Sequence, residues 1–335
     1  MIIIRKRAFA RAALVGNPSD GYQGKTISLI VRNFEAEVVL YEWDTVDILL
    51  TEDDRARFRS VHDLARDVAL HGYYGGIRLI KATVKRFVDY CRVAGVTLHD
   101  RNFSIRYQTT IPRQVGLAGS SAIITATLRC LMAFYDVGIP LDVQPSLVLS
   151  VERDELGVAA GLQDRVAQTY EGLTYMDFSR EHERIVHGLP CYRYEPLDPA
   201  LLPPLYVSYH QGFSEPTEVF HNDVRDRFLR GDEQVVGGMR RVAGLAASAR
   251  EALVGRDARQ LSGLIDENFD VRRTIFNLPP WQVQMIDVAR ACGASANFAG
   301  SGGAVVGTYE GDATLDALRA ALGAIGCRVV TPEVI

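Results

Sequence analysis

The sequence has few cysteines, and no two of them are close enough to form a CxxC pair. The five are Cys91, Cys130, Cys191, Cys292 and Cys327. This spacing excludes a cysteine zinc cluster and a dithiol redox pair. An odd, scattered set favours reduced thiols, so we expect a cytoplasmic protein.

Long apolar runs and long basic runs are also missing. No window of about 18 uncharged apolar residues is present, so we expect no membrane segment. Arg5, Lys6 and Arg7 follow the short apolar run at the N-terminus rather than precede it, which is the wrong order for a secretory signal. The net charge is −4 and the basic residues are not clustered, so we expect no nucleic-acid partner.

The chain is long enough for two lobes. It has 335 residues, of which 47% are hydrophobic, and about 100–200 residues is the usual size of a domain. The proline-rich stretch 190–204 is the best boundary, which predicts an N-terminal lobe over 1–195 and a C-terminal lobe over 196–335. Strand and helix patterns mix without strict alternation, which indicates an α+β fold rather than a doubly wound sheet. The main expected helices cover 77–91, 120–135, 147–156, 235–253, 259–269, 283–291 and 312–322.

The most informative segment is a loop rich in small residues that leads into a helix. Small side chains leave backbone N–H groups uncovered, and the helix adds its own free N–H groups and the positive end of its dipole. Such a loop binds phosphate. The alternative is an ordinary loop with a serine cap. The residues are Pro112, Gly116, Leu117, Ala118, Gly119, Ser120, Ser121 and Ala122.

This loop resembles the ATP-binding motif of the GHMP kinases, the family of galactokinase, homoserine kinase, mevalonate kinase and phosphomevalonate kinase. The segments 10–20 and 297–304 resemble two further motifs of that family, in the expected order. The resemblance implies a two-lobed fold, with an N-terminal lobe similar to domain 2 of ribosomal protein S5 and a ferredoxin-like C-terminal lobe. It also implies ATP and Mg²⁺ as cofactors.

Four segments, 16–20, 99–103, 111–114 and 161–168, are similar to the plant-type glucuronokinases. This likeness implies transfer of the γ-phosphoryl group of MgATP to the anomeric hydroxyl of D-glucuronate, giving glucuronate 1-phosphate. The alternatives are a kinase for another uronic acid, a heptose or a polyol, and a non-catalytic sensor that retains the fold. The partner in each case is a small sugar or sugar acid.

The resemblance assigns roles to the polar residues of these motifs. Asp164 is the expected catalytic base, with a helix cap as its alternative, and Arg11 is expected to stabilise charge on the transferred phosphoryl group. Ser121 and Glu152 are the expected Mg²⁺ ligands, with Glu155 as a rival to Glu152. The expected substrate-binding residues are Asn17, Asp20, Gln163, Gly300, Ser301 and Gly302. The substrate carboxylate needs a cation, for which Arg113, Arg165 and Lys25 remain open.

Overall fold

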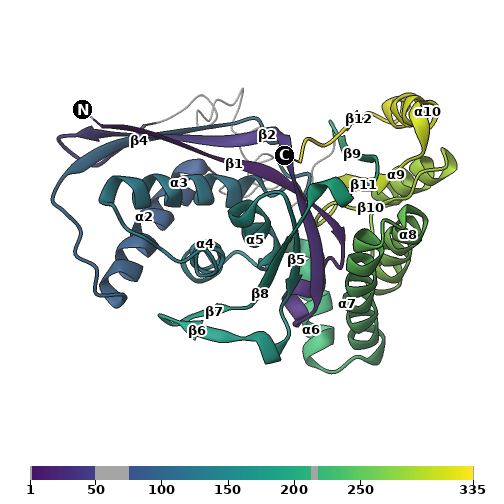
Figure 1. The fold of residues 1–335 in the computed structure, drawn as a ribbon, viewed down its shortest axis with the longest axis horizontal. Coiled ribbons are helices and arrows are strands. Elements are labelled where there is room, and N and C mark those ends of the chain that lie inside the picture. The colour runs from purple at the N-terminus through teal and green to yellow at the C-terminus, as the bar shows by residue number, and fades with distance from the viewer. Residues whose placement is uncertain (1, 50–74, 213–217, 335) are drawn as a thin grey trace, which may run out of the picture.

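The computed structural model describes residues 2–49, 75–212 and 218–334. Two large sheets, a small two-stranded sheet and the helices packed on them make up this part of the chain (Figure 1). Within it, no helix combines the length and the apolar character needed to cross a bilayer. The mixture of helices and largely antiparallel sheets confirms the α+β fold class.

The first sheet is built around two long antiparallel strands, β1 (Ile3–Val15) and β2 (Lys25–Trp43). The sheet order is β3-β4-β2-β5-β8, and β1 pairs with β2. Beyond Phe9, every residue of β1 is buried, and helices from both halves of the chain contact this strand. The other strands are β3 (Asp47–Ile48), β4 (Asn102–Thr109), β5 (Leu173–Asp177) and β8 (Arg193–Leu197).

One side of this sheet carries helices (Figure 1). They are α2 (Gly76–Val93), α3 (Gly119–Tyr135), α4 (Gln144–Ser150) and α5 (Gln163–Tyr170). Of these, α3 and α5 contact the strands and the others pack on these two. The helix expected over 147–156 begins earlier, and its second half, Val151–Glu155, is a π-helical turn. Such turns inside helical segments frequently occur at functional sites.

The second sheet has the order β10-β11-β9-β12, with every neighbouring pair antiparallel. Renumbered along the chain from β9, this is the order 4-1-3-2 of a ferredoxin-like sheet. Its strands are β9 (Leu205–His210), β10 (Asn297–Phe298), β11 (Ala304–Thr308) and β12 (Cys327–Val330). Its helices are α6 (Glu218–Leu229), α7 (Glu233–Val254), α8 (Ala258–Ile275), α9 (Pro280–Ala291) and α10 (Gly311–Ala324).

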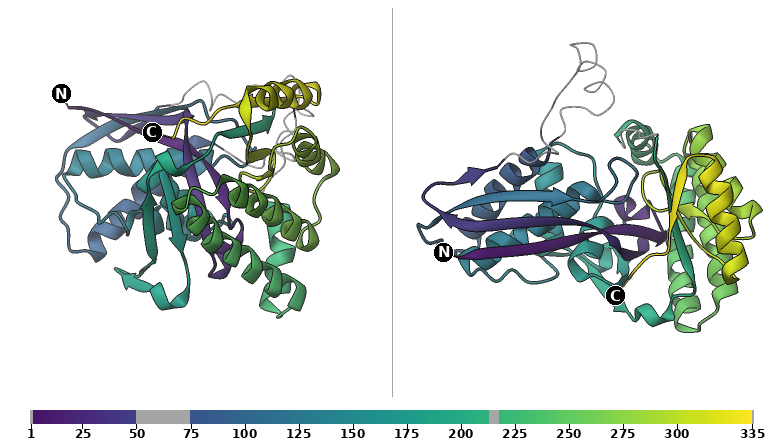
Figure 2. Two further views of the ribbon diagram at one scale, coloured as in Figure 1. Left: turned by 45° about the vertical axis from the view of Figure 1, so that its right-hand side comes forward. Right: turned by 90° about the horizontal axis from the view of Figure 1, so that it is seen from above.

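The two halves share a core rather than meeting at a loose interface. Helix α7 packs against β2 (Figure 2). One apolar cluster includes residues of both sheets. The predicted boundary at 195/196 lies within β8, which is paired to β5 in the first sheet, and the division into lobes stays a prediction. The remaining short elements are η1 (Ser19–Tyr22), η4 (Arg180–His182), η5 (Pro199–Leu201), β6 (Arg184–Val186) and β7 (Leu189–Cys191).

Candidate active site

The predicted phosphate loop has an unusual backbone. Gln114, Gly116 and Ala118 have φ angles of 55°, 76° and 63°, so left-handed residues recur at every second position. Backbones that alternate in this way direct successive N–H groups into one concavity, which binds anions. Helix α3 begins directly afterwards at Gly119. The alternative of a serine cap is wrong, because the N-cap position is Ala118, without a side-chain cap. The buried Ser121 hydroxyl instead donates to the Ala118 carbonyl, at 3.2 Å.

Arg11 joins the three sequence motifs. This side chain is 3% exposed, so Arg11 is a buried residue of β1. Its Nε donates to Asp164 Oδ1 at 2.9 Å, and its second terminal nitrogen also bonds that oxygen. Its first terminal nitrogen donates to the carbonyl of Gly116 in the phosphate loop, at 3.1 Å. The same nitrogen donates to the carbonyl of Ala299 in the segment 297–304, the C-terminal glycine loop. The guanidinium group of Arg11, in the first motif, therefore contacts the phosphate loop, the C-terminal glycine loop and Asp164.

Asp164 lies in the first turn of α5, between two arginines. Arg11 binds Oδ1, and Arg165 lies 3.3 Å from Oδ2. The carboxylate makes no side-chain cap of α5, whose N-cap position is Leu162. The helix-cap alternative for Asp164 is therefore wrong, and the two guanidinium groups fix the orientation of its carboxylate.

Glu152 and Arg165 form a buried ion pair behind Asp164. Arg165 Nε donates to Glu152 Oε2 at 2.7 Å, and a second Arg165 nitrogen bonds the same oxygen. Burial raises the pKa of Glu152, although the adjacent Arg165 counteracts this. Burial alone would lower the pKa of Arg165, but Glu152 and Asp164 together raise it. Both hydrogen bonds from Arg165 go to Oε2 of Glu152, so neither of them uses Oε1.

The rival Glu155 is placed differently. It lies at the end of the π-helical turn, and its carboxylate pairs with Lys85 of α2 at 2.7 Å, with 23% of its side chain exposed. The turn thus separates the two glutamates: Glu152 is 4% exposed beside Arg165, and Glu155 faces a surface lysine. Of the two glutamates, Glu152 is the better placed to be the Mg²⁺ ligand.

A chain of hydrogen bonds connects the first motif with the C-terminal glycine loop. Gln163 Nε2 donates to Asn17 Oδ1 at 2.8 Å, and Asn17 Nδ2 donates to the Gly300 carbonyl at 2.7 Å. That carbonyl also accepts from Arg272 of α8 at 2.8 Å, and Arg272 reaches the Ser301 carbonyl at 3.0 Å. The predicted substrate residues Asn17, Gln163, Gly300 and Ser301 are therefore brought together.

The phosphate loop and the C-terminal glycine loop, which both contain glycines, are in direct contact. A Cβ atom on Gly300 would lie 2.1 Å from the Gly116 carbonyl oxygen, and one on Gly116 would lie 2.8 Å from the Gly302 carbonyl oxygen. Gly302 has a φ of 146° and stands against Gln282 of α9. Close backbone approach explains the glycines at positions 116 and 300.

Three contributors to this site were missed by sequence reasoning. Arg272, 1% exposed, and the fully buried Asn268 are one turn apart on α8, and Asn268 holds the first motif by bonding Gly16 N–H and the Asn17 carbonyl. Gln168 of α5 donates to the Ala118 carbonyl at 2.8 Å. Asn268 and Arg272 are four positions apart, which places them on one face of a helix. The helix predicted from the sequence ends at 269, so Arg272 lies outside it.

All three candidate cations for a substrate carboxylate already interact with other groups of the protein. Arg165 is bound to Glu152, and Lys25 Nζ lies 3.0 Å from Asp177 Oδ2. Asp177, Glu181 and His182 converge closely enough to hold a metal ion, but this ammonium group already neutralises Asp177. Arg113 is exposed, at the start of the phosphate loop.

Asp20 has an altered carboxyl group near the site. It accepts a hydrogen bond from Gln163 N–H at 3.2 Å, and a Cβ on Gly161 would lie 2.0 Å from it. Burial, followed by the charge of Asp164, raises the pKa of Asp20 from 3.8 to about 6. Its ionised form is therefore disfavoured in the folded protein, and stability falls as the pH rises from about 4 to about 6.

We expect Asp20→Asn to stabilise the protein more at pH 8 than at pH 5. At pH 8 the wild-type carboxyl is ionised in the folded state at a free-energy cost, which the neutral amide avoids. The gain in the free energy of unfolding should be about 1 kcal/mol larger at pH 8. Urea unfolding of both proteins at the two pH values measures this, and an equal gain at both would contradict the raised pKa of Asp20.

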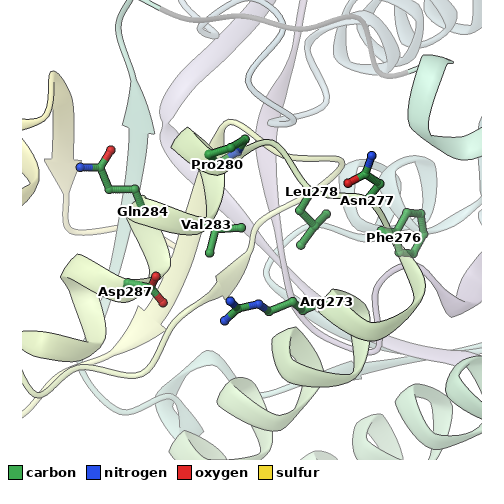
Figure 3. Close-up of a pocket in the computed structure, with 8 residues that line it drawn as sticks. All are labelled: Arg273, Phe276, Asn277, Leu278, Pro280, Val283, Gln284 and Asp287. Atoms are coloured by element: carbon green, nitrogen blue, oxygen red, sulfur yellow. The ribbon is translucent and has the colours of Figure 1, made fainter.

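A hollow of about 480 Å³ lies near the turn between α8 and α9. Figure 3 shows Arg273 extending from α8 in the direction of Asp287 on α9, with Leu278 and Val283 above them. None of the residues predicted for the active site lines this hollow. The functional assignment therefore follows the motifs and not this cavity.

Comparisons with known proteins agree with this geometry. The family model described as "GHMP kinases N terminal domain" matches residues 78–172, which include the phosphate loop and Asp164. Glucuronokinase 1 of Arabidopsis thaliana is 46% identical over 310 residues, covering 90% of this chain and 84% of that protein. The galactokinase of Lactococcus lactis complexed with galactose has a TM-score of 0.77 at 16% identity, covering 99% of this chain and 93% of the other. The mevalonate kinase of Methanococcus jannaschii has a TM-score of 0.70 at 16% identity, covering 100% and 98%.

The fold and these matches define the class: the chain is a phosphotransferase that uses ATP. It belongs to the GHMP kinase family. The resemblance drawn from the three motifs is confirmed, and so is the likeness to plant glucuronokinases.

Proposed function

We propose that this enzyme transfers the γ-phosphoryl group of MgATP to the anomeric hydroxyl of D-glucuronate, giving glucuronate 1-phosphate and ADP. The identity to Glucuronokinase 1 and to Probable glucuronokinase 2 of Arabidopsis thaliana, 46% and 45% over most of the chain, supports this acceptor. The structural observation that carries the proposal is Arg11, which touches Asp164, the phosphate loop and the C-terminal glycine loop at once.

The geometry supports two adjoining subsites: a donor side that binds ATP and an acceptor side that binds the sugar. The N–H groups of the loop around Gly116 and of the first turn of α3 bind the phosphates. Asp164 accepts the proton of the attacking hydroxyl, and Arg11 stabilises charge on the transferred group. Asn17, Asp20 and Gln163, with the backbone at Gly300–Gly302, orient the sugar hydroxyls. Arg11 bonds both Asp164 and the phosphate loop, so it fixes the distance between the acceptor side and the donor side. The acceptor oxygen is therefore held close to the γ-phosphorus.

Mg²⁺ fits the residues available to it. Mg²⁺ takes oxygen ligands and keeps several waters, so one hydroxyl and one carboxylate besides the phosphates suffice. Ser121 supplies a hydroxyl in the first turn of α3, and Glu152 has one carboxylate oxygen beyond its contacts with Arg165. When bound, the ion would neutralise charge on the phosphates.

We expect Glu152→Gln to raise the Mg²⁺ concentration needed for half-maximal activity by about 10-fold or more, because the amide is a poorer ligand. The matched control is Glu155→Gln, which alters a surface ion pair and should leave the Mg²⁺ dependence within about twofold. Titration of ATP turnover with Mg²⁺ measures both. If the two variants behave alike, Glu152 is not a ligand.

The acceptor is tested by measuring ADP release with a panel of D-glucuronate, D-galacturonate, heptoses and polyols. We expect the highest kcat/KM with D-glucuronate. Turnover of another panel member alone would move the assignment to that sugar while retaining the chemistry. Ligand binding without ADP release from any member would favour a non-catalytic sensor.

A further inference from the structure

An acid sugar brings a carboxylate into a partly buried site, and such a group requires a cation with free hydrogen-bond donors. The buried cations of the site are already engaged. Arg11 is bound to Asp164 and two carbonyls, Arg165 to Glu152, and Arg272 to the carbonyls of Gly300 and Ser301. These side chains organise the site and leave the carboxylate to another residue.

Arg225 is placed beside the acceptor side by the packing of α6. Val224 is buried and Phe228, one turn later, packs with it in a cluster that includes Tyr22. The rings of Tyr22 and Phe228 have their centroids 4.7 Å apart. Arg225 follows Val224 and precedes Phe228 by three positions, so it borders the face of α6 that meets Tyr22.

Tyr22 connects Arg225 with the predicted sugar-binding residues. It ends the short helix η1, which also carries Asp20, and Asp20 is bonded to Gln163 N–H. Burial and the charge of Asp20 raise the pKa of Tyr22 to about 12, and the charges of Arg225 and Arg272 act in the opposite direction. The Tyr22 hydroxyl therefore stays protonated at neutral pH and can donate a hydrogen bond.

We propose that Arg225, assisted by the Tyr22 hydroxyl, binds the carboxylate of the acid sugar and so selects an acidic acceptor. The exposed Arg225 makes no hydrogen bond or ion pair within residues 2–49, 75–212 and 218–334, so its donors are available. This inference rests on the proposed function, because it presumes an acidic sugar.

The charge of the acceptor side complements such a substrate. Arg272 is 1% exposed, and the hydrogen bonds that it donates go to backbone carbonyls and not to a carboxylate. Burial, followed by the nearby charge of Arg11, lowers the pKa of Arg272 to about 9. An anionic ligand between Arg272 and Arg225 would offset this positive potential, and a neutral sugar would not.

The test compares D-glucuronate with D-glucuronamide, in which a neutral amide replaces the carboxylate. We expect Arg225→Gln to raise KM and the dissociation constant of D-glucuronate by about 10- to 100-fold. The values for D-glucuronamide and KM for MgATP should change by less than about twofold. Tyr22→Phe should weaken D-glucuronate binding less, by about threefold to tenfold. Arg230→Gln, at an exposed arginine just after α6, is the matched control and should behave as the wild type.

Equal losses with the acid and the amide, or no loss with either, would overturn the role of Arg225. Direct calorimetric binding separates this result from a failure of the proposed function. A wild-type protein that binds D-glucuronate through Arg225 but releases no ADP would contradict the function and support the inference. A wild-type protein that binds the amide as tightly as the acid would contradict the inference.

Discussion

Replacing Asp164 with asparagine is expected to lower kcat by about 10²- to 10⁴-fold, the usual contribution of a positioned general base. The amide keeps the size of the side chain but cannot accept the hydroxyl proton. It also loses the charge that pairs with Arg11 and Arg165, at 2.9 and 3.3 Å. Binding of ATP should persist, because the phosphate loop contributes its N–H groups independently of Asp164. Steady-state kinetics and nucleotide titration measure the two effects separately.

The control for this variant is Asp316→Asn, at an exposed aspartate of α10, which should leave kcat unchanged. Turnover of Asp164→Asn near the wild-type rate would show that Asp164 is not the base. A mechanism in which the protein only positions the two substrates would survive that result.

Adding one methyl group at Gly300 is expected to have an effect of similar size. The Cβ of Gly300→Ala would lie 2.1 Å from the Gly116 carbonyl oxygen and 3.0 Å from an Arg11 nitrogen, so the two glycine loops must separate. A displacement of about 1 Å at a phosphoryl-transfer site lowers the rate by about 10²-fold. We therefore expect kcat to fall by about 10²-fold or more, together with a lower melting temperature.

Gly244→Ala in α7 is the matched control. No atom lies within 4 Å of the added Cβ, and alanine is the better helix former, so activity should be unchanged and stability equal or slightly higher. Wild-type kcat in Gly300→Ala would contradict the close packing of the two loops.

The local features of the site could be predicted from the sequence, because they depend on neighbouring residues. The phosphate loop before α3, Asp164 at the start of α5 and the glycine loop at 300–302 are all contained in short motifs. The family resemblance gave their order and their roles. The structure adds that Arg11 joins them through the carbonyls of Gly116 and Ala299.

The features that the sequence did not predict depend on partners far along the chain. Arg272 bonds carbonyls 28 and 29 residues away, and Asn268 bonds a carbonyl 251 residues away. No local pattern contains such partners. The π-helical turn that separates Glu152 from Glu155 likewise departs from the regular helix that the sequence predicts over 147–156. The sequence also leaves Arg165 open as the cation for the substrate carboxylate, but in the structure Arg165 is paired with the buried Glu152.

Carbon NMR of the reaction with [1-¹³C]-labelled D-glucuronate and MgATP tests most directly whether the loop that binds the triphosphate delivers phosphorus to the anomeric oxygen beside Asp164. We predict that the C1 signal of the product is split by coupling to phosphorus, and that Asp164→Asn shows no such signal on the same time scale. An unsplit C1 signal after full release of ADP would place the phosphoryl group elsewhere and contradict the account.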